Sequence, residues 1–138
     1  MKTISIIALF ACVACGGTGP GETELAGTRW VLAELDGAAT PPVGDGDAGY
    51  LRFEAADRRF SASAGCNGMG GSWNSEGTSL GFSEVMSTLM ACQEPLMTRE
   101  RQLSEALGAT TTYRVSGNRL ELRDGVRVLA AFTSGSAE

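Results

Sequence analysis

The 138-residue sequence contains no histidine, and Lys2 is its only lysine. The lack of histidine excludes Ser-His and Cys-His nucleophile pairs, imidazole metal ligands and histidine-based pH switches. The lack of further lysines excludes the lysine of a phosphate-binding P-loop. The other basic residues are scattered arginines and the net charge is −5, so no basic face for nucleic acid is expected. We therefore expect no nucleic-acid partner, and we assign no cofactor, metal site or catalytic residue.

The amino terminus has the pattern of a bacterial lipoprotein signal. An apolar run over 4–14 follows one positive charge and is too short to cross a bilayer as a stable helix. Cys15 follows this run at the position of a lipobox cysteine, and Cys12 is the alternative. We predict a signal peptide over 1–14, lipidation of Cys15, a flexible tether over 15–26, a folded domain over 27–133 and a loose tail over 134–138.

This signal predicts a protein of the cell envelope, anchored to a membrane by its lipid. Because Gly16 rather than aspartate follows Cys15, the outer membrane or the periplasmic face is favoured over the inner membrane. The predicted folded part holds two cysteines, Cys66 and Cys92, and in an oxidising compartment their simplest state is a disulfide. Such a bond would add about 3–4 kcal/mol by closing a loop. A reactive thiol at Cys66 is the alternative.

Alternating apolar residues predict a mainly β domain. Strands are expected over 28–37, 50–55 and 60–64, near Trp73, over 80–85, and in a three-stranded antiparallel meander over 113–132. One segment has a different period. Leu96, Leu103 and Leu107 repeat at helical spacing, with Pro95 in the expected first turn, and this pattern predicts a single packed helix.

The stretch SAGCNGMGGSW, residues 63–73, combines four glycines with a cysteine, an asparagine and a tryptophan. A phosphate loop would need a helix directly after the glycines, and a dinucleotide fingerprint would need a βαβ unit; neither is expected around this stretch. Glycine also permits positive φ, bulges and sharp bends in strands. We therefore interpret the stretch as a bent part of a sheet. Cys66 would anchor it, Asn67 would bond loop backbone, and Trp73 would fill the core.

SAGCNGMGGSW, then LGFSEVMSTLMAC, then a helix bearing Glu100, then YRVSGNRLEL together resemble the META domain, or HslJ-like, family. The resemblance covers about 27–132, and GTRWVLAELDG is similar to the family's first strand. Gly68-Met69 and Leu89 depart from the family's usual residues, so no surface contact is transferred to them. The family pattern falls on Gly65, Cys66, Asn67, Gly71, Trp73, Ser87, Thr88, Met90, Ala91, Cys92 and Glu100.

The resemblance implies an antiparallel, incomplete barrel-like sheet of about seven or eight strands, with the helix packed on or in it. It also implies a non-enzymatic envelope protein that supports tolerance to heat shock, other stress or antibiotics, in which the pattern residues determine the fold. We therefore expect a lipoprotein that binds an apolar ligand or a protein partner. A structural module of a secretion or envelope complex is the alternative.

Two other chemistries fit the sequence less well. An enzyme would have to use Cys66 or a carboxylate pair of Glu84 with Glu94 or Glu100, and no spacing aims two of these acids at one centre. A calcium loop would begin at Asp45 and Asp47. The EF-hand glutamate is missing there, because Ala56 stands at its position, so a solvated loop is expected.

Overall fold

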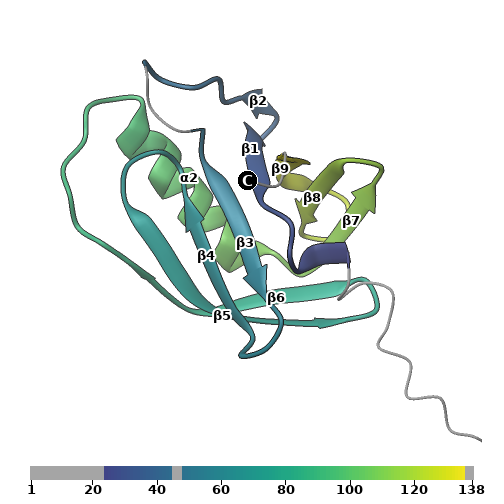
Figure 1. The fold of residues 1–138 in the computed structure, drawn as a ribbon. Helices are drawn as coiled ribbons and strands as arrows, with labels where there is room; N and C mark the ends of the chain where they lie inside the picture. Colours follow the sequence, from purple (N-terminus) through teal and green to yellow (C-terminus); the bar gives the residue numbers. More distant parts are fainter. Residues whose placement is uncertain (1–23, 45–47, 136–138) are drawn as a thin grey trace, which may run out of the picture.

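The computed structural model describes residues 24–44 and 48–135, which fold into antiparallel strands around one long helix (Figure 1). β1 and β3 through β9 pair in a closed ring, because β9 pairs back onto β1, and β2 adds a short strand to β1. The predicted mainly β fold with one packed helix is confirmed. The elements in chain order are β1 (Trp30–Leu35), β2 (Ala38–Ala39), β3 (Tyr50–Glu54), β4 (Arg59–Ser63), β5 (Gly68–Glu76), β6 (Ser79–Ser87), α2 (Leu96–Ala109), β7 (Thr112–Ser116), β8 (Arg119–Arg123) and β9 (Val128–Ser134).

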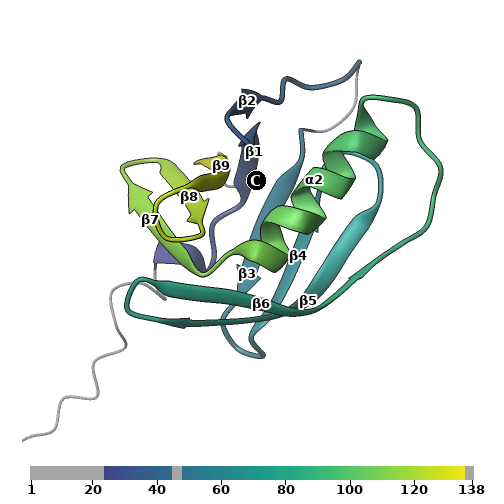
Figure 2. The same cartoon turned by 180° about the vertical axis from the view of Figure 1, so that it is seen from behind.

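Few residues are paired at two of the strand interfaces in this ring. β1 pairs with β3 only at residues 30–31, and β6 pairs with β7 only where Ser79 faces Thr112. Beyond that point α2 packs beside β6 (Figures 1 and 2). The Ser87 hydroxyl at the end of β6 contacts the Glu100 carboxylate of α2 at 3.2 Å. The barrel that was expected to be incomplete therefore closes, but on the side of β6 away from β5 most of the strand lacks a paired strand, and α2 packs against it.

The hydrophobic core lies between α2 and the inner faces of the strands (Figure 2). In β3, Leu51 and Phe53 are buried while their neighbours point outward, as period-two alternation requires. Leu103 and Leu107 of α2 are fully buried in the same core. The Phe53 ring stands edge-on to Trp73 with centroids 5.2 Å apart. Each such large apolar side chain contributes about 1.5–3 kcal/mol by leaving water.

Two elements differ in extent from the sequence prediction. α2 begins at Leu96, so Pro95 precedes the helix instead of lying in its first turn. The turn predicted at 74–77 is shorter, because residues 74–76 still pair with β6 and β5 and β6 are nine residues each. Polar side chains in these positions can face water while their backbone groups stay in the ladder, so polarity alone did not mark the turn.

The folded domain extends past both predicted boundaries. Leu25 is buried and its carbonyl accepts a hydrogen bond from Trp30 Nε1 at 3.1 Å, so residues 24–26, predicted as tether, belong to the packed domain. Ser134, predicted as loose tail, is the last residue of β9. The next N–H, of Gly135, donates to a backbone carbonyl at 2.8 Å. Burial of one leucine and pairing of the last strand explain both corrections.

Some predicted features lie outside the described residues. These are the lipidation candidates Cys15 and Cys12 and the aspartates Asp45 and Asp47 of the considered calcium loop. Within the described ranges, no helix combines the length and the apolar character that crossing a bilayer requires. In the same ranges, no group of three or more Cys, Asp or Glu side chains is arranged to hold a metal ion.

Candidate functional site

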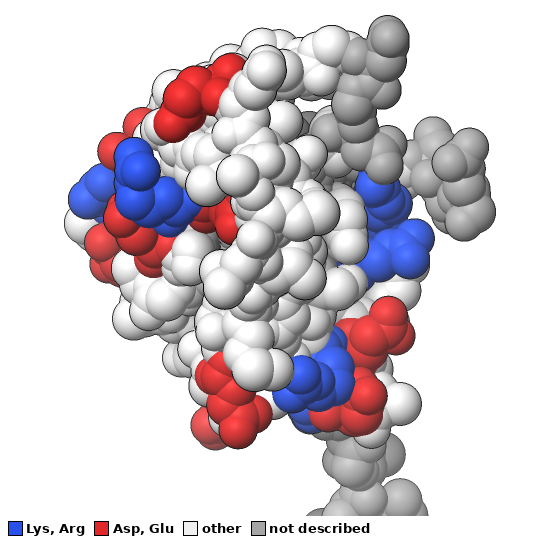
Figure 3. Space-filling view, turned by 90° about the vertical axis from the view of Figure 1, so that its left-hand side faces the viewer, with Lys and Arg blue, Asp and Glu red and all other residues white. Residues whose placement is uncertain are grey.

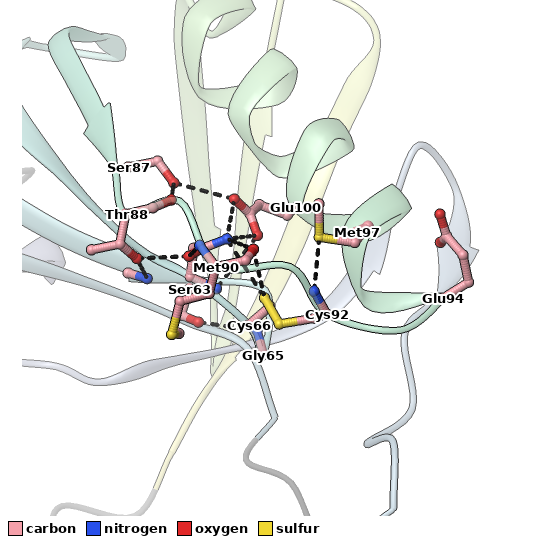
Figure 4. The surroundings of a disulfide bond; sticks show 12 residues. Ser63, Gly65, Cys66, Ser87, Thr88, Met90, Cys92, Glu94, Met97 and Glu100 are labelled. Carbon is pink, nitrogen blue, oxygen red and sulfur yellow. Dashed lines mark hydrogen bonds between the residues drawn. A yellow bond between two sulfur atoms is a disulfide. The ribbon is translucent and has the colours of Figure 1, made fainter.

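A disulfide joins two connections that are far apart in sequence. Cys66 lies between β4 and β5, Cys92 lies between β6 and α2, and their Cα atoms are 6.2 Å apart across a separation of 26 residues (Figure 4). The predicted disulfide is confirmed. Since both sulfurs are in this bond, Cys66 is not a free thiol, and the alternative of a reactive nucleophile at this position is wrong.

Asn67, next to the disulfide, is 2% exposed and uses its whole side-chain hydrogen-bonding capacity. Its Oδ1 accepts from the Met90 N–H at 2.7 Å and from the Thr88 hydroxyl at 2.8 Å. Its Nδ2 has two protons, and its nearest acceptors are Glu100 Oε2 at 2.8 Å and the Met90 carbonyl at 3.0 Å. One buried amide therefore fixes the backbone of the β6–α2 connection on both sides of Met90.

Glu100 ties α2 to the same connection. Its carboxylate points from α2 toward the disulfide, where it accepts from Asn67 Nδ2 and lies 3.2 Å from the Ser87 hydroxyl (Figure 4). The Thr88 hydroxyl adds a further link, because it accepts from the Gly68 N–H at 3.2 Å. β5, the β6–α2 connection and α2 thus meet in one hydrogen-bonded cluster, which we call the Asn67 cluster (Asn67, Ser87, Thr88, Met90 and Glu100).

The glycines of the 63–73 stretch serve backbone geometry. Gly65 has φ +108, a conformation that residues with a Cβ rarely adopt. At Gly71 a Cβ would lie 2.5 Å from the Ser83 carbonyl oxygen, because β6 bulges toward it at this point. Trp73 fills the core as expected, and its Nε1 donates to the Glu54 carbonyl at 3.2 Å. The interpretation of this stretch as a bent sheet is confirmed.

The family model of the META domain matches residues 23–136. The chain belongs to the META domain family. Three solved structures support this fold. An NMR structure of a protein from Burkholderia xenovorans is 24% identical, covering 97% of this chain and 100% of that one with a TM-score of 0.63. A second NMR structure is 22% identical over 81% of this chain and 91% of the other, also with a TM-score of 0.63.

The third is a crystal structure of a DUF4847 family protein from Bacteroides vulgatus, 16% identical over 86% of this chain and 99% of the other, with a TM-score of 0.60. At these identities the three structures support the fold of this META domain and nothing finer. No curated protein matches the chain.

The carboxylates considered as a catalytic pair are engaged separately in this META domain. Glu84 Oε2 accepts from the Ser72 hydroxyl at 3.0 Å. Glu94 accepts from the Thr98 N–H at the start of α2 at 3.1 Å. Glu100 belongs to the Asn67 cluster. Each acid stabilises local structure, and none is positioned with another as a general acid and base would be.

The end of β6 and the connection that follows it expose large apolar side chains that the sequence analysis did not single out as a surface. Met86, Leu89 and Met90, which we call the exposed apolar segment, are 68%, 97% and 56% exposed. Figure 3 views the molecule from this side and shows uncharged surface across its middle with charged groups at its margins. Ser87, Thr88 and Met90 belong to the family pattern and Leu89 departs from it, and neither observation says which of these side chains face water. Ala91, the neighbouring pattern residue, is also exposed.

A different surface carries exposed ion pairs. On β1 and β8, Arg119 donates two hydrogen bonds to the Glu34 carboxylate, the shorter at 3.1 Å. This hydrogen bonding lowers the pKa of Glu34 and raises the pKa of Arg119. Asp36 likewise raises the pKa of Arg127 through a side-chain hydrogen bond. A solvent-open depression of about 300 Å³ lies beside this pair, between the end of α2 and the β8–β9 turn. The four side chains of these two ion pairs are all accessible to solvent.

Proposed function

We propose that this META domain is a non-enzymatic, membrane-anchored binding module that presents the exposed apolar segment to a protein partner. The observation that carries the proposal is the exposure of Met86 at the end of β6 and of Leu89 and Met90 on the following connection, whose backbone is held in place. Exposed apolar side chains grouped on a surface are typical of interaction sites. An uncharged centre with charged margins, as in Figure 3, is also the usual composition of a protein interface.

The rigidity of the connection favours binding. Its backbone is fixed by Asn67 at Met90, by the Thr88 N–H bonded to the Gly68 carbonyl at 3.0 Å, and by the Cys66–Cys92 disulfide. A binding loop that is already ordered loses little conformational entropy on association, so more of its contact energy contributes to affinity. Methionine side chains remain adaptable on such a fixed backbone and fit partners of varied shape.

The position of the segment favours a partner over the anchoring membrane. Ala26, near the start of the described chain, pairs with Phe53 at one end of β3. The exposed apolar segment lies by the opposite end of the sheet, where Tyr50, Ser63 and Gly68 are aligned across β3, β4 and β5 (Figure 1). A lipid at Cys15 would therefore hold the sheet by the end away from this segment, which would face other proteins of the envelope.

A protein partner also fits better than an apolar ligand held inside the barrel. The interior is occupied by tightly buried side chains, among them Leu103, Leu107, Leu120 and Phe132. A pocket for an apolar molecule would require these side chains to move apart. In the cell, we propose that the interaction supports tolerance to heat shock, other stress or antibiotics. Membership of a secretion or envelope complex is the alternative role, and the same surface would serve it.

Site-specific photo-crosslinking in cells tests the binding surface. A photoreactive amino acid at Leu89 should give one discrete adduct with a protein, whereas the same probe at Val126 should not. Val126 is a matched control because it is 91% exposed on the β8–β9 turn, away from the segment. With the partner identified and purified, Leu89→Ser should weaken affinity about tenfold, the loss expected for an interface anchor, while Val126→Ser should leave it unchanged.

Equal adducts from both positions, or none at Leu89, would contradict the proposed surface. Native mass spectrometry of the detergent-extracted protein provides the complementary result. If a bound lipid or other apolar small molecule is found and no protein adduct forms, the function would be ligand binding and not partner binding. Metabolic labelling with a fatty acid tests the anchor, since Cys15→Ser should abolish incorporation and Cys12→Ser should not.

A further inference from the structure

The described part of the domain offers oxidants few reactive side chains. Its two cysteines are already joined in the disulfide. The chain has no histidine, and the two tryptophans, Trp30 and Trp73, are 3% and 2% exposed. The thioether sulfurs of methionine are the oxidisable sulfurs that remain. Oxidant chemistry on this surface is therefore directed to methionine.

Four methionines of the described chain occupy different environments. Met69 is 4% exposed and packs in the core. Met97 is partly buried, and its sulfur accepts the Cys92 N–H at 3.4 Å. Met86 and Met90 are the two methionines of the exposed apolar segment. The two most exposed methionines of the described residues thus lie on the surface to which partner binding is assigned.

We propose that Met86 and Met90 form a reversible oxidation site that changes the exposed apolar segment from apolar to polar and so releases its partner. This inference rests on the proposed function for its biological consequence, but the oxidation site itself does not. A hydroperoxide or hypochlorous acid is the oxidant class. Leu89 lies between the two methionines in sequence, so oxidation on both sides of it places sulfoxide dipoles where a dry contact is required.

The chemistry balances without any group from the protein. The thioether sulfur attacks one of the two equivalent oxygens of hydrogen peroxide, and the O–O bond breaks. The attacked oxygen becomes the sulfoxide oxygen and its proton passes to the departing hydroxide, which leaves as water, so sulfur loses two electrons and the peroxide gains them. A dithiol-dependent sulfoxide reductase reverses the step, since its dithiol becomes a disulfide and the oxygen leaves as water.

The backbone at Met86 and Met90 is held by interactions that do not involve the sulfur atoms, so the fold should tolerate this oxidation. The Met90 backbone is held on both its N–H and its carbonyl by Asn67, and neither bond involves the sulfur. Met86 is held in β6 by pairing with Gly70 of β5. Sulfoxides at these positions would project into water, and the hydrogen bonds and the strand pairing that hold the two residues would remain. Oxidation of Met69 would instead place a polar group in the core, where it costs stability.

The experiment uses the purified full-length protein with dilute hydrogen peroxide. Peptide mapping by mass spectrometry should show Met86 and Met90 oxidised several-fold faster than Met69. Retention on a phenyl hydrophobic-interaction column should fall in parallel, and the thermal unfolding temperature should stay unchanged. The Met86→Leu/Met90→Leu double variant keeps the apolar surface but cannot be oxidised there, so its retention should not change with peroxide.

Oxidation of Met69 at the same rate as Met86 and Met90 would overturn the inference, and so would unchanged retention after both have become sulfoxides. These outcomes are independent of any partner. If mapping and retention behave as expected while no adduct forms at Leu89, the proposed partner binding fails and the oxidation site stands. If the adduct forms, peroxide should abolish it in the wild-type protein and leave it intact in the double variant.

Discussion

Two regions of this META domain are held by polar interactions, and they differ in what surrounds those interactions. In the Asn67 cluster, a buried amide is bonded on every donor and acceptor it has. On the outer face of β1 and β8, Glu34 and Arg119 form a well-aligned ion pair, but both side chains are 36% exposed. The hydrogen bonds have similar lengths in the two regions. Their contributions to stability should differ because water competes only for the second set.

Hydrogen bonds of similar length in the two regions should therefore contribute differently to the free energy of unfolding. Removing a buried partner leaves other buried groups without a hydrogen bond, and each such group costs about 1–3 kcal/mol. Removing an exposed partner returns the other side chain to water at almost no cost. Four predictions test how large this difference is, and the covalent bond beside the Asn67 cluster gives the largest expected effect.

The Cys66→Ser/Cys92→Ser variant should lose about 3.5 kcal/mol of unfolding free energy, because the unfolded chain regains the entropy of an open 26-residue loop. Urea denaturation of the oxidised wild type and the double variant measures this loss. The exposed apolar segment should keep its position, since Asn67 still holds Met90. Strong loss of hydrogen-exchange protection at Met90 would show that the disulfide, and not the amide, fixes the connection.

Asn67→Ala should cost about 3 kcal/mol, because the Met90 N–H and carbonyl lose their partner and the Glu100 carboxylate loses one of its donors. Asn74→Ala is the matched control. Asn74 is exposed in the neighbouring part of β5, so its replacement should change stability by less than about 0.5 kcal/mol. A similar cost for the two variants would remove the distinction between the buried cluster and the surface.

Gly71→Ala should cost about 2 kcal/mol, because the new methyl group would lie 2.5 Å from the Ser83 carbonyl oxygen and force the bulged strand outward. Gly70→Ala tests the same chemistry one residue earlier, where the nearest atom is 3.3 Å away. Thermal unfolding of both proteins should place Gly71→Ala clearly lower. Equal unfolding temperatures would mean that β6 can move away from the new methyl group at its bulge without loss of stability.

Glu34→Gln should have the smallest effect, a few tenths of a kcal/mol. The Arg119 hydrogen bond lowers the pKa of Glu34 in the folded protein. The pair therefore stabilises the fold above the ordinary carboxylate pKa, and this contribution is lost as the pH falls through the lowered value. Unfolding curves from pH 7 down to acid should show the wild type and the variant converging, and added salt should reduce their difference at neutral pH. A difference that grows on acidification would contradict this assignment.

Sequence patterns predicted the strands because local rules decide them. The alternation at Leu51 and Phe53 and the turn glycines each report on a few neighbouring residues. The partner of Asn67 could not be found in this way, because Glu100 is 33 residues away and on a helix. The burial of Leu25 was missed for the same reason. Its environment is created by Trp30 and β3, and a single leucine carries no periodic signal.

The exposed apolar segment was missed for a different reason. Leu89 and Met90 follow the end of β6 and precede α2, so neither strand nor helix periodicity says whether they face inward or outward. The hydrogen bonds from Asn67 hold the Met90 backbone against the domain, and the side chains of Leu89 and Met90 are exposed. A polar side chain of the β4–β5 connection thus helps to determine where the apolar residues of the β6–α2 connection lie.

The pairing of β1 with β9 also has a consequence for how the chain can be made. Its first strand finds its full-length neighbour only when its last strand has been synthesised, since Trp30 lies opposite Ser134. The contacts that complete the ring are thus the most distant in sequence, and such contacts form late. The ring of strands is therefore expected to close after the hairpins of β3 to β6 and of β7 and β8 have formed, as one of the last steps of folding.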